Sequence, residues 1–183
     1  MDKNFLEEVR QGKHWHDPIE NYIFPGMTSW LVGDQSFGLG TLRLFQMNRF
    51  QISEVTPHTH RFNFKAWVLQ GKVINRIWLS RNHPKSDSFM VSRLKYKGKP
   101  GEYIKTEENI LNFLYIELKY ESGDEYEIYT DEIHSIHFGK NSLVLIQESA
   151  VISNKSVIIE PYVNGQVIET LKTEDWMFKK PGC

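Results

Sequence analysis

The chain has 183 residues, of which 40% are hydrophobic and 25% are charged, and its net charge is −1. These values are typical of a soluble globular protein and exclude a disordered segment. The balanced charge argues against a nucleic-acid partner, and no apolar run is long enough for a membrane helix. The N-terminus lacks the apolar core of a secretory signal and the only cysteine is Cys183, so we expect a cytoplasmic protein without disulfides.

The N-terminal part of the chain differs in character from the rest. A helix is predicted from Asn4 to Gln11, with Asn4 as its N-cap. Residues 18–40 are rich in turn-forming Pro and Gly, so we expect irregular structure there with one or two short strands. We expect residues 1–40 to form an arm that packs on the remainder, and residues 1–183 to form a single domain.

The following residues, 41–172, show the alternation and the turn signals of many short strands. The strands are predicted at Leu42–Gln46, Arg49–Val55, His58–Leu69, Val73–Leu79, Phe89–Tyr96, Asn112–Tyr120, Glu125–Tyr129, Ser135–Phe138, Ser142–Gln147, Val157–Tyr162 and Gln166–Leu171. Short turns at Gly71, "ESGD", "GKN" and "VNG" predict four hairpins. The pattern is typical of an all-β, antiparallel sandwich or barrel.

The segment with the strongest alternation begins with two histidines, His58 and His60. Its even positions go on to Phe62, Phe64 and Val68, whereas its odd positions begin polar, so we expect the even set to face the core. Buried imidazoles need partners for their ring nitrogens. Two of them at positions i and i+2 project in parallel and could bind one metal ion. The alternative is a pair at the mouth of the barrel that hydrogen-bonds to water.

A third histidine lies some 75 residues later on a different predicted strand. Strand parity places His134 with Ile136 and Phe138, which form an inward-facing set, and it places His137 on the opposite side. We therefore expect His134 to join the pair, and His137 to lie at the surface or behind the ligands.

At these residues the sequence resembles the cupin superfamily. The first cupin motif has a histidine pair, then a glutamate and a glycine at fixed spacing, and here His58 and His60 are followed at that spacing by Phe64 and Gly71. The second motif retains only its histidine, His134. The resemblance implies an antiparallel double-stranded β-helix, or jelly-roll barrel.

One departure from the cupin pattern bears directly on the chemistry. Phe64 occupies the position of the family's glutamate ligand, and phenylalanine cannot bind a metal. The resemblance then implies either a three-histidine site made of His58, His60 and His134, as in thiol dioxygenases, or a site that no longer holds metal. Glu54 has the parity of the histidine pair and could supply a carboxylate, and Tyr129 could place a hydroxyl group in the barrel.

Three functions remain open at this point. The first is a metal-binding cupin that acts as an Fe(II)-dependent dioxygenase on a small polar molecule, with Zn, Ni or Mn as other candidate ions. The second is a metal-free cupin that binds or isomerises a sugar or nucleotide derivative, and the third is a non-catalytic interaction module with a vestigial site. We also expect a homodimer, because many cupins pair through edge strands.

Overall fold

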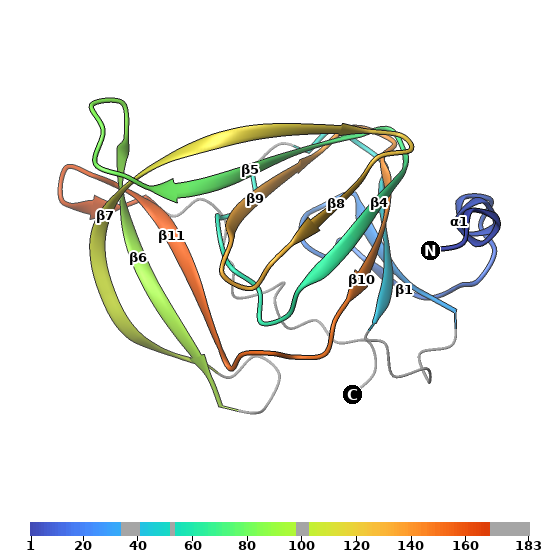
Figure 1. The fold of residues 1–183 in the computed structure, drawn as a ribbon, viewed down its shortest axis with the longest axis horizontal. Coiled ribbons are helices and arrows are strands. Elements are labelled where there is room, and N and C mark those ends of the chain that lie inside the picture. Colours follow the sequence, from blue (N-terminus) through green and yellow to red (C-terminus); the bar gives the residue numbers. More distant parts are fainter. Residues whose placement is uncertain (34–40, 52–53, 98–102, 169–183) are drawn as a thin grey trace.

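The computed structural model describes residues 1–33, 41–51, 54–97 and 103–168, which form one helix and two antiparallel sheets (Figure 1). The helix, α1, spans Lys3–Arg10. In spatial order the first sheet contains β1 (Trp15–Glu20), β2 (Met27–Val32), β3 (Leu42–Met47), β10 (Leu143–Glu148), β4 (Phe64–Gln70) and β8 (Glu125–Ile128). The second contains β12 (Gln166–Val167), β11 (Lys155–Val163), β6 (Asp87–Tyr96), β7 (Tyr103–Glu121), β5 (Lys72–Ser80) and β9 (Ile133–Phe138).

The order of the strands is that of a jelly roll. The chain crosses from the first sheet to the second between β4 and β5, returns at β8, and then changes sheet again at β9, β10 and β11. This alternation between two facing sheets is the jelly-roll pattern. On the edge of β9 that does not pair with β5, His58 forms an isolated antiparallel bridge with His134. The predicted all-β, antiparallel jelly-roll class is confirmed, with the described strands in two sheets.

The main core lies between the two sheets. Phe64, Ala66 and Val68 of β4 point into it, and Ile136 and Phe138 of β9 meet them from the opposite sheet. The even positions of the segment from His58 to Val68 therefore face inward, as the alternation predicts. Burial of such apolar side chains is the main stabilising contribution to the fold.

The outer face of the first sheet is also buried, which the alternation did not predict. Trp67 and Leu69, on the odd positions of β4, pack with Leu44 of β3 under α1, and Val9 of the helix is fully buried against them. Figure 1 shows α1 on the outer side of the sheet that contains β4 and β10. The odd positions in this half of β4 are therefore buried as well, because the helix covers them.

Only one of the four predicted hairpins is a hairpin. The "VNG" turn joins β11 and β12, which pair directly, and Asn164 and Gly165 have the positive φ angles of a tight reversing turn. The turns at Gly71, "ESGD" and "GKN" instead connect strands of opposite sheets. Gly71 also has a positive φ of 78°, and a Cβ atom there would lie 2.9 Å from the Cα atom of Ser142.

Several boundaries differ from the predicted ones. Asp2, rather than Asn4, caps α1, because its side chain accepts a hydrogen bond from the Asn4 backbone N–H. The one or two short strands expected in the arm are present as β1 and β2, which extend the first sheet beyond β3 and so satisfy their backbone groups. No strand forms in the described residues of the range 49–55. Cys183 and the last residues of the strand predicted at Gln166–Leu171 lie outside the described residues. No helix in the described ranges is long and apolar enough to cross a membrane.

Candidate metal centre

The backbone brings two of the predicted ligands side by side. The His58 N–H donates to the His134 carbonyl oxygen at 2.9 Å, and the His134 N–H donates to the His58 carbonyl oxygen at 3.0 Å. His58 also bridges to Ile158 of β11, so the segment before β4 runs between β9 and β11. His60 follows two residues later and points to the same side. The fold thus joins residues from two distant segments at one place.

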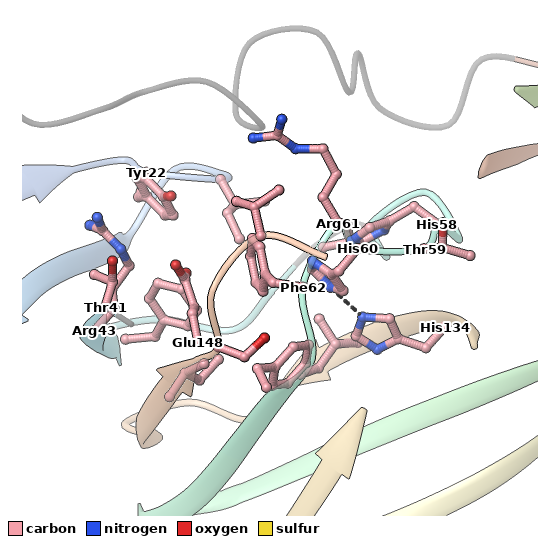
Figure 2. Close-up of a pocket in the computed structure, with 18 of the residues that line it drawn as sticks. Tyr22, Thr41, Arg43, His58, Thr59, His60, Arg61, Phe62, His134 and Glu148 are labelled. Carbon is pink, nitrogen blue, oxygen red and sulfur yellow. Dashed lines mark hydrogen bonds between the residues drawn. The ribbon is translucent and has the colours of Figure 1, made fainter. Parts of the chain in front are cut away.

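The three imidazole rings converge on the wall of an internal cavity (Figure 2). One ring nitrogen from each of His58, His60 and His134 can be chosen such that all three lie within 4.8 Å of one another. The Nε2 atoms of His60 and His134 are 2.8 Å apart. His58 and His134 are buried, and His60 is half-buried at the cavity wall.

Hydrogen bonds behind the rings fix which nitrogen faces the centre. The Nδ1 atom of His58 lies 2.7 Å from the carbonyl oxygen of Thr56, which can only accept, so Nδ1 carries the proton and Nε2 keeps its lone pair. The Nδ1 atom of His134 lies 2.9 Å from Oδ1 of Asn75, with the same consequence. Metal-binding histidines commonly have their second nitrogen held in this way.

The environment keeps all three imidazoles neutral at physiological pH. Burial lowers the pKa of His58 to about 4, although the hydrogen bond to Thr56 acts in the opposite direction. Burial lowers the pKa of His134 and of His60 well below the usual value, and the neighbouring histidines lower both further. Neutral imidazole is the form that binds a metal ion.

This donor set fits a divalent transition metal. Imidazole nitrogens at about 2.0–2.1 Å from an ion lie about 2.9–3.4 Å from one another in tetrahedral or octahedral geometry. The His60–His134 pair is already close to that spacing, at 2.8 Å. The Nδ1 atoms of His58 and His134 are anchored by acceptors behind the rings. Imidazole suits Fe, Zn, Cu and Ni, so the donor set does not select one ion.

Phe64 forms part of the same wall. Its ring centroid is 4.9 Å from that of His60, with the two planes nearly perpendicular at 87°, and 5.7 Å from that of His134. It is 5% exposed and belongs to the main core. The residue at the position of the family's glutamate therefore contacts the histidines but contributes an apolar surface.

The other predicted site residues lie elsewhere. The carboxylate of Glu54 binds Arg76 and accepts a hydrogen bond from Ser135, and it does not line the cavity. Tyr129 is 49% exposed and its hydroxyl donates to Glu127, also outside the cavity. His137 is half-buried on the face of β9 opposite His134. Among the described residues, the only group of three or more potential metal ligands is the histidine trio.

The groups that orient the ligands were not predicted from the sequence. Asn75 is fully buried on β5, at the inward-facing position between Val73 and Ile77. The sequence does contain a signal for Asn75, because it is a single amide in an otherwise apolar inward-facing row. A buried polar group of this kind needs a hydrogen-bond partner. The carbonyl of Thr56 has no such signal, because any residue could provide it.

The cavity beside the histidines has a volume of about 450 Å³ and is lined by both sheets. Its wall is mostly aromatic and aliphatic, with a few polar side chains that include Arg43, Thr41 and Glu148. This size and this mixture of surfaces are typical of a small-molecule site.

Comparison with known proteins finds solved structures of low sequence identity. No family model and no curated protein matches the sequence. Solved structures that match include KdgF from Halomonas sp., at 16% identity and a TM-score of 0.41, covering 76% of this chain and 89% of that one. The Drosophila melanogaster CENP-C cupin domain matches at 14% identity and a TM-score of 0.41, covering 81% of this chain and 100% of that one. Streptomyces albus HEPD with 2-hydroxyethylphosphonate and Fe(II) bound matches at 12% identity and a TM-score of 0.41, covering 71% and 23%.

The strand order and the position of the histidines decide the fold assignment. Two facing sheets of jelly-roll order enclose a cavity, and histidines from the segment before β4 and from β9 meet on its wall. The fold is a cupin fold. The chain has three histidines where its sequence predicts them, and an apolar ring at the position of the glutamate in the cupin motif.

Proposed function

We propose that this cupin binds one divalent transition metal ion through His58, His60 and His134, and that it is an enzyme acting on a small polar molecule in the adjoining cavity. Fe(II)-dependent dioxygenation is the reaction we assign to it. The observation that carries the proposal is the convergence of three neutral imidazoles, two of them anchored through Nδ1, on the wall of the cavity.

The contribution of each residue follows from the geometry. Thr56 and Asn75 hold the rings of His58 and His134 so that their Nε2 atoms face the centre. Phe64 excludes water from one side of the centre and adds no charge. A bound ferrous ion would supply the chelation of the substrate and the activation of dioxygen. Three neutral ligands leave the full 2+ charge of the ion in place, which favours an anionic or chelating substrate.

Elemental analysis of protein purified without a polyhistidine tag tests the metal site. After anaerobic reconstitution with Fe(II) and desalting, we expect close to one equivalent of iron, and with Co(II) we expect the visible absorption of a cobalt–imidazole centre. The His60→Ala variant should lose both signals. The His137→Ala variant is the matched control, because His137 lies on the opposite face of β9, and it should keep them. Less than roughly a tenth of an equivalent in the unmodified protein would refute the site.

The reaction is tested separately with an oxygen electrode. Fe(II)-loaded protein should consume dioxygen when supplied with fractions of a metabolite extract that contain small polar compounds, and the His60→Ala variant should not. Consumption that is equal in the two proteins would contradict the assigned reaction.

One observation favours a second candidate, a metal-free cupin that binds or isomerises its ligand. His60 and His134 can satisfy each other through the hydrogen bond between their Nε2 atoms without an ion. In that case ligand binding would persist in EDTA and would not respond to added metal.

A further inference from the structure

A buried guanidinium lies on the side of the cavity away from the histidines. Arg43 of β3 is 7% exposed and lines the same cavity as His58, His60 and His134. In Figure 2 Arg43, Thr41 and Tyr22 lie on one side of the cavity and the histidines on the other. Since Phe45 two residues later packs in the main core, Arg43 projects from β3 toward the interior.

Arg43 has few partners for a buried cation. One of its terminal nitrogens donates to Ser29 Oγ at 2.9 Å, and its guanidinium carbon lies 5.3 Å from the centre of the Tyr22 ring. A guanidinium has five N–H donors. Within the described ranges Arg43 takes part in no ion pair, whereas Arg76 pairs with two carboxylates. A buried charge without a counter-ion is costly, so this position is suited to an anion brought by a ligand.

The nearby carboxylate does not neutralise Arg43. Glu148 of β10 lines the cavity beside it. Burial raises the pKa of Glu148, and the charge of Arg43 offsets only part of that rise. A close ion pair would instead lower the pKa of the acid. Both groups line the cavity without an ion pair between them among the described residues, so each can still interact with a ligand.

The register of the first sheet gives the distance to the histidines. Ile146 of β10 pairs with Arg43 on one side and with Ala66 of β4 on the other, and Glu148 pairs with Phe64. Arg43 is thus two strands away from β4, which is about 10 Å between backbones. Phe64 in turn contacts His60. A small molecule seated on Arg43 can therefore extend to the histidine centre.

We propose that Arg43 binds the carboxylate of a monoanionic ligand, and that Glu148 accepts a hydrogen bond from a hydroxyl or ammonium group next to that carboxylate. A monoanion matches the single charge of Arg43, because the other arginine of the cavity wall, Arg61, has its guanidinium over the ring of Tyr96. A dianion such as phosphate would be repelled by ionised Glu148. The ligand class is then a small hydroxy- or aminocarboxylate. The assignment of this ligand class to the substrate rests on the proposed function, but the anion subsite itself does not require the metal.

The test uses the thermal unfolding midpoint of metal-free protein in sodium chloride, alone or with low-millimolar L-lactate, acetate or phosphate replacing part of the chloride at constant ionic strength, because phosphate at high concentration stabilises folded proteins non-specifically. A ligand that binds the folded state raises this midpoint. For the unmodified protein we expect the largest rise over chloride in lactate, a smaller rise in acetate, and the smallest in phosphate. The Arg43→Met variant should lose the rise, and Arg43→Lys should retain part of it. Because each variant is compared with itself in chloride, a change in its basal stability does not affect the result.

Control variants make the outcome decisive. Arg93→Met removes an exposed arginine on β6 and should respond as the unmodified protein does. Glu148→Gln should reduce the preference for lactate over acetate and for lactate over phosphate. The proposal is overturned if no carboxylate raises the midpoint, if Arg43→Met responds like the unmodified protein, or if phosphate exceeds lactate. Unmodified protein that binds no metal yet shows the lactate response would refute the metal site alone and leave this subsite intact.

Discussion

The Nε2 atoms of His60 and His134 lie 2.8 Å apart, although 74 positions separate the two residues in the chain. That proximity depends on the bridge between His58 and β9, which aligns the two segments through a reciprocal pair of backbone hydrogen bonds. It also depends on Asn75, which holds His134 from behind. The four predictions that follow test separate parts of this arrangement.

Replacing Asn75 should weaken metal binding without removing a ligand. In Asn75→Leu the Nδ1–H group of His134 loses its acceptor, so the ring is no longer held in the binding orientation. We expect the affinity for Co(II), measured by absorption titration, to fall about 10- to 100-fold. Asn75→Asp keeps an acceptor at the same place and should bind at least as tightly as the unmodified protein. Equal affinity in a folded Asn75→Leu variant would contradict this role.

Placing a carboxylate at residue 64 should make stability depend on metal. Phe64→Glu introduces a buried acid beside His60 in place of a core ring, which should cost about 3–5 kcal/mol of unfolding free energy in metal-free protein. Added Zn²⁺ or Co²⁺ should recover much of that loss, because the acid then lies beside a bound cation. Urea unfolding with and without metal measures both effects. Phe64→Leu should lose stability through the cavity it leaves but show no extra recovery with metal.

The metal-free protein should lose stability in mild acid. The pKa of His58 is lowered to about 4 in the folded state, compared with 6.5 when unfolded, so between these values the unfolded chain binds a proton that the folded chain does not. Stability is therefore fully present above pH 6.5 and falls as the pH drops toward 4, by about 3 kcal/mol for this group alone.

Urea unfolding at a series of pH values tests this acid dependence, and the His58→Gln variant should show a shallower decline. Stability that stays constant between pH 7 and pH 4.5 in metal-free protein would show that the three imidazoles are not kept neutral by burial.

Weakening the contact between α1 and the first sheet should reduce stability but not metal binding. Val9 is fully buried against the outer face of that sheet, opposite the cavity. Val9→Ala should cost about 2 kcal/mol in urea unfolding. Co(II) affinity at a temperature where the variant is folded should be unchanged. A large loss of affinity would mean that the helix acts on the site through the sheet.

Much of the local structure could be predicted from the sequence, because alternation along a strand is a local property. The inward row from His58 to Val68, the tight turn at Asn164 and Gly165, and the inward orientation of His134 all follow from the period of two and from turn chemistry. The same reasoning selected the three histidines that the fold brings together. The alternation also placed His137 on the other face of β9.

Long-range pairing was decided only in the tertiary structure. A glycine turn such as that at Gly71 can reverse a chain within one sheet or carry it to the facing sheet, and the choice depends on which arrangement buries the most apolar surface. The burial of Trp67 depends on a helix some 60 residues earlier in the chain. The support of His134 by Asn75 and the position of Arg43 in the cavity likewise arise from strands that meet only in the fold. The sequence alone thus determined which side chains point inward, because the direction of a side chain on a strand depends on a few neighbouring residues. The packing of the two sheets decided which of these side chains meet, because the energy of strand pairing depends on the whole chain.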